Sequence, residues 1–370
     1  MRRKTLLGQL LRLLWLLVVP VTLFVCGQAK KFPALVDVFY SGKVYPVIRG
    51  AVSSITKHVP YSLAELLIYA VSAFIVIFFI VLLIRLIKRK EHAFIRLVSF
   101  VISIILAAGF LFPAFYVMWG FNYYRTPAGE KLGLPERQYT REELYSVCLD
   151  LAQNAKALRE KVTVDTGGVF CGDLYEMDRE VVSAYDEYGD RHPMFSASVP
   201  PAKHVLASEF LSRCGISGIY IFLTEEPNIN VNEPFLYLPY SAAHETAHFL
   251  GYAREEDASF IAFLVCSEAS SPAVSYSGYM HALVNCGNAL SKADPELYRE
   301  LWSTYSSGMA ADLDDYSEHY NKYADTETFK TSNDLNDSYL KFNDQDKGVL
   351  SYEEDVSLIL RYYDSLGFFG

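Results

Sequence analysis

Residues 241–264 read Ser-Ala-Ala-His-Glu-Thr-Ala-His-Phe-Leu-Gly-Tyr-Ala-Arg-Glu-Glu-Asp-Ala-Ser-Phe-Ile-Ala-Phe-Leu, and we expect the rest of the chain to be organised around them. His244 and His248 are four residues apart, which on an α-helix places both imidazoles on one face, one turn apart. Two neutral imidazoles in this arrangement can bind Zn²⁺ side by side. Glu245 follows the first histidine, where its carboxylate can act as general base toward a water molecule at the metal. The stretch therefore predicts a helix that carries a catalytic zinc site.

A third protein ligand is expected just beyond this helix. Gly251 should end the helix as a C-cap, and a second helix should run from about Ala253 to about Cys266, because its apolar residues recur at helical spacing. The first turn of that second helix is acidic, with Glu, Glu and Asp at positions 255–257. A catalytic zinc needs three protein ligands and one open position, so we expect the acidic turn to supply the third ligand.

The acidic turn also resembles a known peptidase pattern. The segment Glu255-Glu-Asp-Ala-Ser259 is similar to the Glu-x-x-Ala-Asp/Asn pattern of gluzincin-type metallopeptidases. This resemblance implies that Glu255 is the metal ligand and that Ser259 supports the site from one turn further on. Serine departs from the Asp or Asn of the pattern, and a hydroxyl is a poorer partner for a ligand imidazole than a carboxylate. Glu256, about 100° further round the helix, stays open as the alternative ligand.

A wider resemblance covers most of the chain. The segments around the histidine pair, just after the last apolar run and near the C-terminus are similar to the DUF3810 family of bacterial membrane proteins. The resemblance implies a zinc peptidase and leaves its substrate open. The segments that carry it are Trp119–Arg125, Gly215–Asn232, the histidine pair itself, Arg254–Ala262, Asn336–Asn343 and Gly348–Tyr352.

The composition predicts a membrane protein. The chain has 370 residues, of which 51% are hydrophobic, and the apolar excess is concentrated in its first third. Three apolar runs, at about 5–26, 62–84 and 94–118, are each long enough for a transmembrane helix, so a lipid bilayer is an expected partner. The formal net charge of −10 gives no indication of nucleic-acid binding, and we expect no nucleic acid as a partner.

The distribution of basic residues predicts the orientation in the membrane. Five basic residues lie in the short 85–96 connection, and three more follow Met1. Cytoplasmic loops carry such an excess, so both segments are expected in the cytoplasm. The residues between the first two spans, 27–61, are expected to form a connecting loop, and their basic residues are more spread out. Three spans then place everything after Trp119 outside the cytoplasm.

Residues 1–125 are thus predicted to be a membrane anchor and residues 126–370 an extracytoplasmic catalytic domain. The fold class expected for this domain is α+β, mainly helical and zincin-like. Its length of roughly 245 residues is sufficient for a sizeable core. Helical patterns are expected at 141–161, 203–213, 276–290, 295–306, 308–322 and 351–365, with a strand at 218–223 and an extended segment at 228–232.

Two further sets of residues are candidates for the site. In zincin folds the strand before the metal helix pairs with extended substrate, so Asn228, Asn230 and Asn232 are either part of such a substrate strand or an ordinary Asn-rich turn. Gluzincins also use a Tyr or His beyond the metal helices to stabilise the oxyanion. Three residues are candidates for this stabilising role, and packing in the core is the alternative role for each; they are Tyr276, Tyr279 and His281.

Two functions follow from different classes of protein. The first is a membrane-anchored, zinc-dependent metallopeptidase that hydrolyses peptide bonds of a peptide or protein substrate. The alternative is a membrane-anchored, non-catalytic binding or sensor protein with a structural or vestigial zinc site. The intact Glu245 favours the enzyme, because a structural site has no use for a base there, whereas Ser259 favours the alternative.

Overall fold

Two units make up the computed structural model, which describes residues 16–88, 93–324, 326–343 and 354–370. The first unit holds the apolar helices and also includes the short segment Phe222–Thr224. The second unit holds the histidine pair. It comprises Ser53–Ser62, which the sequence analysis assigned to the anchor, together with Pro127–Ile221 and Glu225–Gly370.

The first unit contains two helices long and apolar enough to cross a membrane. These stretches are Leu63–Arg85, with a mean hydropathy of 3.1, and Leu97–Met118, with 2.4. The predicted span at 5–26 falls partly on residues 1–15, which lie outside the described residues. The described part of this region contains the apolar helix α2, which has 12 residues. Two candidate spans are therefore present among the described residues, and the third stays a prediction. In chain order this unit contains α2 (Val18–Ala29), α3 (Pro33–Leu35), the π-helix η2 (Val36–Val44), α5 (Leu63–Lys88), α6 (Ala93–Met118) and the 3₁₀-helix η4 (Gly120–Tyr124), and it shares α4 (Tyr45–Thr56) with the second unit.

The prediction of a connecting loop at 27–61 is wrong, because most of this segment is helical. Pro33 stands at the start of α3, where its fixed φ suits a first helical turn. Buried tyrosines then hold the helices in place. Tyr45 is fully buried, and the Tyr40 hydroxyl donates to the backbone carbonyls of Tyr116 and Val117 at 3.3 and 3.0 Å. The helices of this segment are held by long-range contacts of this kind. A search for long apolar runs does not reveal such contacts.

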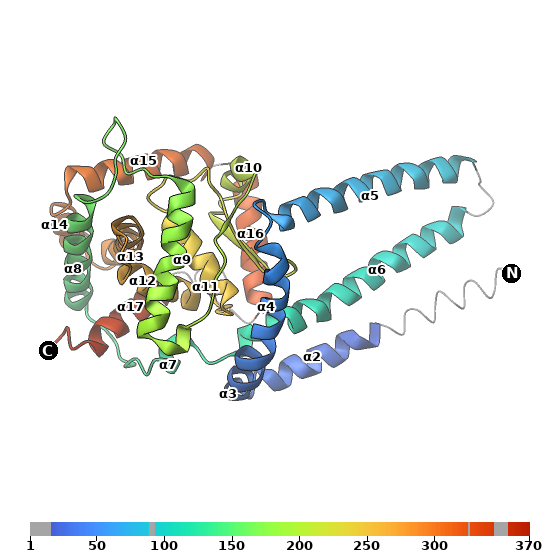
Figure 1. Cartoon of the computed structure of the whole chain (residues 1–370), viewed down its shortest axis with the longest axis horizontal. Coiled ribbons are helices and arrows are strands. Elements are labelled where there is room, and N and C mark those ends of the chain that lie inside the picture. The colour runs from blue at the N-terminus through green and yellow to red at the C-terminus, as the bar shows by residue number, and fades with distance from the viewer. Residues whose placement is uncertain (1–15, 89–92, 325, 344–353) are drawn as a thin grey trace. The chain divides into compact units, whose positions relative to one another are not determined.

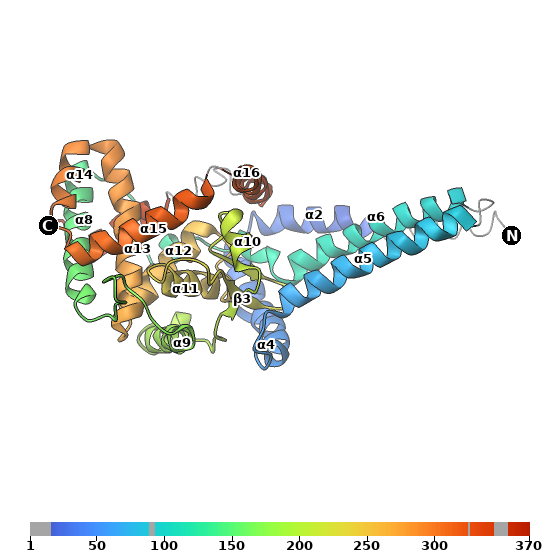
Figure 2. The same cartoon turned by 90° about the horizontal axis from the view of Figure 1, so that it is seen from above.

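The second unit is mainly helical with one small sheet, which makes it an α+β fold (Figures 1 and 2). The strand order is β1-β3-β2, with β1 parallel and β2 antiparallel to the central β3, so β2 lies at an edge. Its elements are α7 (Ala128–Lys131), α8 (Arg141–Arg159), α9 (Leu174–Arg191), the 3₁₀-helix η5 (Pro193–Phe195), β1 (Lys203–His204), α10 (Ser208–Arg213), β2 (Gly218–Ile221), β3 (Glu226–Ile229), α11 (Leu238–Phe249), α12 (Glu255–Ser267), α13 (Pro272–Ala293), α14 (Pro295–Trp302), α15 (Ser307–Ala324), α16 (Glu327–Phe342) and α17 (Glu354–Ser365).

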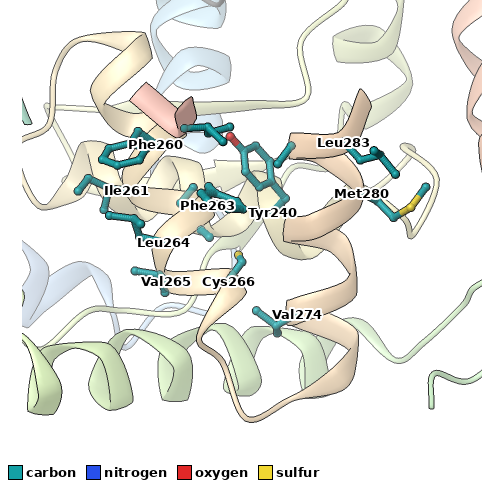
Figure 3. Packing of buried hydrophobic residues seen from close by; sticks show 14 of the residues in the cluster. Tyr240, Phe260, Ile261, Phe263, Leu264, Val265, Cys266, Val274, Met280 and Leu283 are labelled. Atoms are coloured by element: carbon teal, nitrogen blue, oxygen red, sulfur yellow. The ribbon is translucent and has the colours of Figure 1, made fainter. Parts of the chain in front are cut away.

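The core of this unit forms around α12, which is buried on all sides. Every residue from Phe260 to Cys266 is at most 3% exposed, as expected for a helix that is apolar all round. Figure 3 shows these side chains with those of α13 beside them. On the far side of α13 lies α8, which begins at a capping box between Thr140 and Glu143. The helix α12 is therefore packed against neighbours on several sides.

Most of the predicted helices are present, with shifted ends. The segment 203–213 is the exception, because its start pairs as β1 with β3 and only Ser208–Arg213 is helical. Three α-helices of this unit were not expected, namely α9, α16 and the four-residue α7. The apolar face of α9 includes Tyr185 and Tyr188, and its many charged residues conceal that face in the sequence. The beginning of the predicted 351–365 helix and the segment Gly348–Tyr352 lie outside the described residues.

Candidate metal centre

The first metal-site helix, α11, is fixed by hydrogen bonds to its neighbours. The Tyr185 hydroxyl on α9 donates to the Ala243 carbonyl at 2.6 Å, and the Tyr240 hydroxyl donates to the Ser259 carbonyl on α12 at 3.0 Å. Gly251 has a φ of 87°, and its N–H donates to the His248 carbonyl at 2.9 Å. The predicted glycine C-cap is thereby confirmed, because a left-handed residue that ends the helix favours glycine. The chain turns there, and α12 begins at Glu255.

Three side chains from α11 and the start of α12 converge. Among the described residues, His244, His248 and Glu255 form the one group of at least three metal-ligand types whose ligand atoms all lie within 4.8 Å of one another. Oε2 of Glu255 is 3.2 Å from Nε2 of His244 and 3.5 Å from Nε2 of His248. Glu256 does not belong to this group. The structure thus brings Glu255, rather than Glu256, to the histidine pair.

The spacing of these atoms fits a tetrahedral zinc ion. Zinc binds imidazole nitrogen and carboxylate oxygen at about 2.0–2.2 Å, and a tetrahedral angle then separates two ligand atoms by roughly 3.4 Å. The two measured separations of 3.2 and 3.5 Å from Glu255 lie on either side of that value. Two imidazoles and one carboxylate are also the ligand types of a catalytic zinc site rather than a structural one. A catalytic site has three protein ligands and leaves the fourth position open.

The histidine rings are oriented by groups on their other side. Nδ1 of His248 lies 2.7 Å from the Tyr252 carbonyl, which can only accept, so Nδ1 carries a proton and Nε2 is the nitrogen that lies toward Glu255. Burial lowers the pKa of His248, but the charge of Glu255 outweighs burial and raises this pKa to about 9, so zinc would have to displace a proton from Nε2. Nδ1 of His244 lies 3.3 Å from Oγ of Ser259, the residue predicted to support the site. Burial lowers the pKa of His244 and so favours its neutral, metal-binding form.

Glu245 lies beside this group in a buried position against β2. Its side chain approaches Gly218 so closely that a Cβ atom there would lie 2.6 Å from Oε1, and the backbone N–H of Tyr220 donates to the carboxylate. Among the described residues Oε2 has no hydrogen-bond partner, although Glu245 is only 5% exposed. Burial, assisted by the charge of Glu255 and opposed by that of His248, raises the pKa of Glu245 to about 8. A buried carboxylate with a free oxygen and a pKa near neutrality is suited to general base catalysis.

The three candidates for an oxyanion stabiliser lie in different surroundings. The Tyr276 hydroxyl donates to Asp312 at 2.6 Å, and the Tyr279 ring packs edge-on against Phe263. His281 stacks on Tyr240, with ring centroids 3.6 Å apart. Burial and the neighbouring His244 lower the pKa of His281 to about 3, so this ring is neutral. Of the three residues, His281 is thus the one whose pKa is affected by a residue of the candidate metal centre, His244.

The asparagines of the predicted substrate strand have partners inside the fold. The Asn228 amide donates to the carbonyls of Ile219 and Glu226, and the Asn230 amide donates to Ser212, Ile216 and Glu233. Asn228 and Asn230 are at most 1% exposed. The Asn232 amide donates to Ser212 at 3.0 Å and to the Tyr323 hydroxyl at 3.4 Å. These contacts hold the segment that leads into α11.

Two contributors to the site were not identified from the sequence. The Tyr252 carbonyl is a backbone group, so no side-chain pattern indicates it. Gly218 precedes α11 by 20 residues and matters only because β2 lies against Glu245. A glycine at the start of a strand can indicate close approach by another part of the chain, and that was the available signal.

Comparison with known proteins agrees with the resemblance noted in the sequence. No curated protein and no solved structure matches the chain. A family model described as a protein of unknown function, DUF3810, matches residues 40–360, which include both metal-site helices and most of the apolar unit. Because this match covers well over half of the 370 residues, the chain belongs to the DUF3810 family.

Proposed function

We propose that this chain is a membrane-anchored, zinc-dependent metallopeptidase with His244, His248 and Glu255 as the zinc ligands. The observation that carries the proposal is the buried Glu245 carboxylate beside three ligand atoms at tetrahedral spacing. A structural or vestigial site has no need of a carboxylate buried without a full set of partners, because such burial destabilises the fold.

The proposed chemistry divides between the metal and Glu245. When bound, the ion would supply Lewis acidity, which polarises the scissile carbonyl and makes the attacking water more acidic. Glu245 would accept the proton of that water on its carboxylate and then deliver the proton to the leaving amine nitrogen. His281, which is neutral and whose pKa is lowered in part by His244, is the favoured candidate to donate to the developing oxyanion, whereas Tyr276 and Tyr279 are engaged elsewhere.

The proposed location is the cell membrane, as a multi-pass protein with three spans and an extracytoplasmic catalytic domain of zincin-like fold. Two helices of sufficient length and hydropathy support the membrane association. The basic cluster at 85–96 supports the orientation. The substrate would be a peptide or protein outside the cytoplasm.

A peptidase assay on three variants of the full chain tests the function. Glu245→Gln keeps the shape of the side chain but cannot accept the proton, so hydrolysis of casein should fall by roughly 10³-fold or more while zinc content is unchanged. His244→Ala and His248→Ala each remove one of three ligands and should lose stoichiometric zinc, measured by mass spectrometry of the metal. If wild-type protein binds zinc but cleaves nothing, the non-catalytic alternative holds. Full zinc occupancy in both histidine variants would exclude the ligand assignment.

A further inference from the structure

The plane of the His281 ring on α13 is set by the ring of Tyr240. The two rings stack with centroids 3.6 Å apart and an angle of 14° between their planes. The Tyr240 hydroxyl donates to the Ser259 carbonyl at 3.0 Å, and the Tyr240 backbone N–H donates to Oγ of Ser277 at 3.1 Å. Tyr240 is thereby fixed to both α12 and α13, and His281 stacks on a ring that is itself held in place.

Asn285 lies one helical turn beyond His281 and faces its Nδ1. Nδ2 of Asn285 is 3.5 Å from Nδ1 of His281, and the same nitrogen donates to Oδ2 of Asp355 at 2.7 Å. Asp355 is 2% exposed and lies in the first turn of α17, where the positive end of the helix dipole favours an ionised carboxylate. Because such a carboxylate can only accept hydrogen bonds, the amide nitrogen of Asn285 and not its oxygen is the atom at this position.

This contact determines which nitrogen of His281 carries the proton. The amide nitrogen of Asn285 has two hydrogens and accepts no hydrogen bond. One hydrogen is donated to Asp355, and the other is available to Nδ1 of His281, so Nδ1 must be the acceptor. Burial and the neighbouring His244 lower the pKa of His281 to about 3, so the ring is neutral and has a single N–H. That N–H is therefore at Nε2.

The position of this proton decides whether His281 can stabilise negative charge. An oxyanion is stabilised by hydrogen-bond donors, and a neutral ring with its proton on Nδ1 would present a lone pair from Nε2 instead. We propose that Asn285 is a positioning residue that fixes His281 with its proton on Nε2, and that Asp355 holds the Asn285 amide in the required orientation. The use of this donor in catalysis rests on the proposed peptidase function, whereas the choice of tautomer does not.

Nitrogen NMR of the full chain in detergent, labelled with ¹⁵N-histidine, tests the tautomer directly. The His281 signals are those absent from His281→Gln. The two ring nitrogens are distinct in their couplings to the carbon-bound ring protons, so the spectrum identifies the protonated one. We expect Nε2 to be protonated both with and without added zinc, since Asn285 and not the metal sets the tautomer. A proton on Nδ1, or an even mixture, in the wild-type protein would overturn the inference, and this result does not depend on the folding of any Asn285 variant.

Asn285→Asp should reverse the tautomer at nearly unchanged side-chain shape. The carboxyl groups at positions 285 and 355 would share one proton, because two like charges so close cannot both ionise, and an oxygen lone pair would then face Nδ1 of His281. We expect the His281 proton to move to Nδ1. We also expect kcat on casein to fall by about 10²-fold, the cost of one lost oxyanion donor, with KM and zinc content little changed.

The matched control is Asn288→Asp, since Asn288 is exposed and lies on the same helix. It should leave both the tautomer of His281 and kcat unchanged. If Asn285→Asp lowers kcat but His281 keeps its proton on Nε2, Asn285 has a merely structural role and the inference is wrong.

Casein hydrolysis by the wild-type protein separates this inference from the proposed function. If casein is not cleaved but the His281 proton lies on Nε2 and moves in Asn285→Asp, the peptidase function fails and the positioning of His281 by Asn285 stands. If casein is cleaved but the wild-type proton lies on Nδ1, the peptidase function stands and the positioning role is wrong.

Discussion

A single methyl group at Gly218 should disable the proposed general base without removing the metal. The added Cβ would lie 2.6 Å from Oε1, 2.7 Å from Cγ and 2.9 Å from Cδ of Glu245. Gly218 is paired with Ile229 on β3, so the strand cannot retreat without losing its ladder. The side chain of Glu245 is therefore the part that moves, and Gly218→Ala should displace its carboxylate from its position beside the candidate metal ligands.

The size of the effect follows from the distances. Ordinary contacts of a Cβ begin at 3.4 Å, so the carboxylate must move by at least 3.4 − 2.6 = 0.8 Å. A misplacement of about 1 Å at a reacting group can cost about 10²-fold in rate. We therefore expect kcat to fall by about 10²-fold, which corresponds to about 2.7 kcal/mol in the activation free energy.

The assay measures kcat on casein with the full chain in detergent, together with zinc content and thermal unfolding. Gly287→Ala is the matched control, because a Cβ there meets its nearest atom, in Tyr298, at an ordinary 3.4 Å and the residue lies within α13. The control should retain activity. Full activity in Gly218→Ala would show that Glu245 is not the base held against β2. Loss of zinc in this variant would show instead that the methyl group disturbs the ligands.

Other predictions address the third ligand, the topology and the pH dependence. Glu255→Gln should weaken zinc binding, since a neutral amide is a poor ligand, whereas Glu256→Gln should retain full zinc; the reverse result would move the ligand by one position. A reporter that is active only outside the cytoplasm should work when fused after Gly370 and be silent near Lys90, and the opposite pattern would place the catalytic unit in the cytoplasm. Burial raises the pKa of Glu233 to about 7, against the lowering effect of its hydrogen bond with Ser212. The folded state then keeps a proton that the unfolded state releases near pH 4.3, so stability should fall by up to about 3 kcal/mol as pH rises from about 4.5 to 7. Thermal unfolding of Glu233→Gln should lack this dependence, and an identical pH profile in the variant would refute the assignment.

Local regularity made much of the candidate site predictable. The helical spacing of His244 and His248, the stop at Gly251 and the acidic start of α12 are all set within one or two helical turns. Such features depend on backbone geometry that neighbouring residues share, so the sequence displays them directly. The resemblance to gluzincins then pointed to Glu255, which the structure brings to the histidines.

Other features depended on parts of the chain that meet only after folding. The segment 27–61 is helical because its tyrosines are buried against distant backbone, and 203–213 begins as a strand because β3 is available to pair with it. The sequence left a substrate strand and an Asn-rich turn both open for Asn228 and Asn230, which in the structure satisfy backbone and side-chain groups inside the fold. No local pattern separates these outcomes, because polar residues and tyrosines occur in both settings.

The sequence by itself determined the candidate ligands, the apolar segments and the mainly helical character, since each follows from the type and spacing of nearby residues. Only the tertiary structure decided what makes Glu245 a plausible base. Its pKa is raised because β2 and the surrounding helices exclude water from it, and Gly218 is needed because that strand lies so close. Desolvation and close approach are properties of packed surfaces, which the order of residues along one helix does not contain.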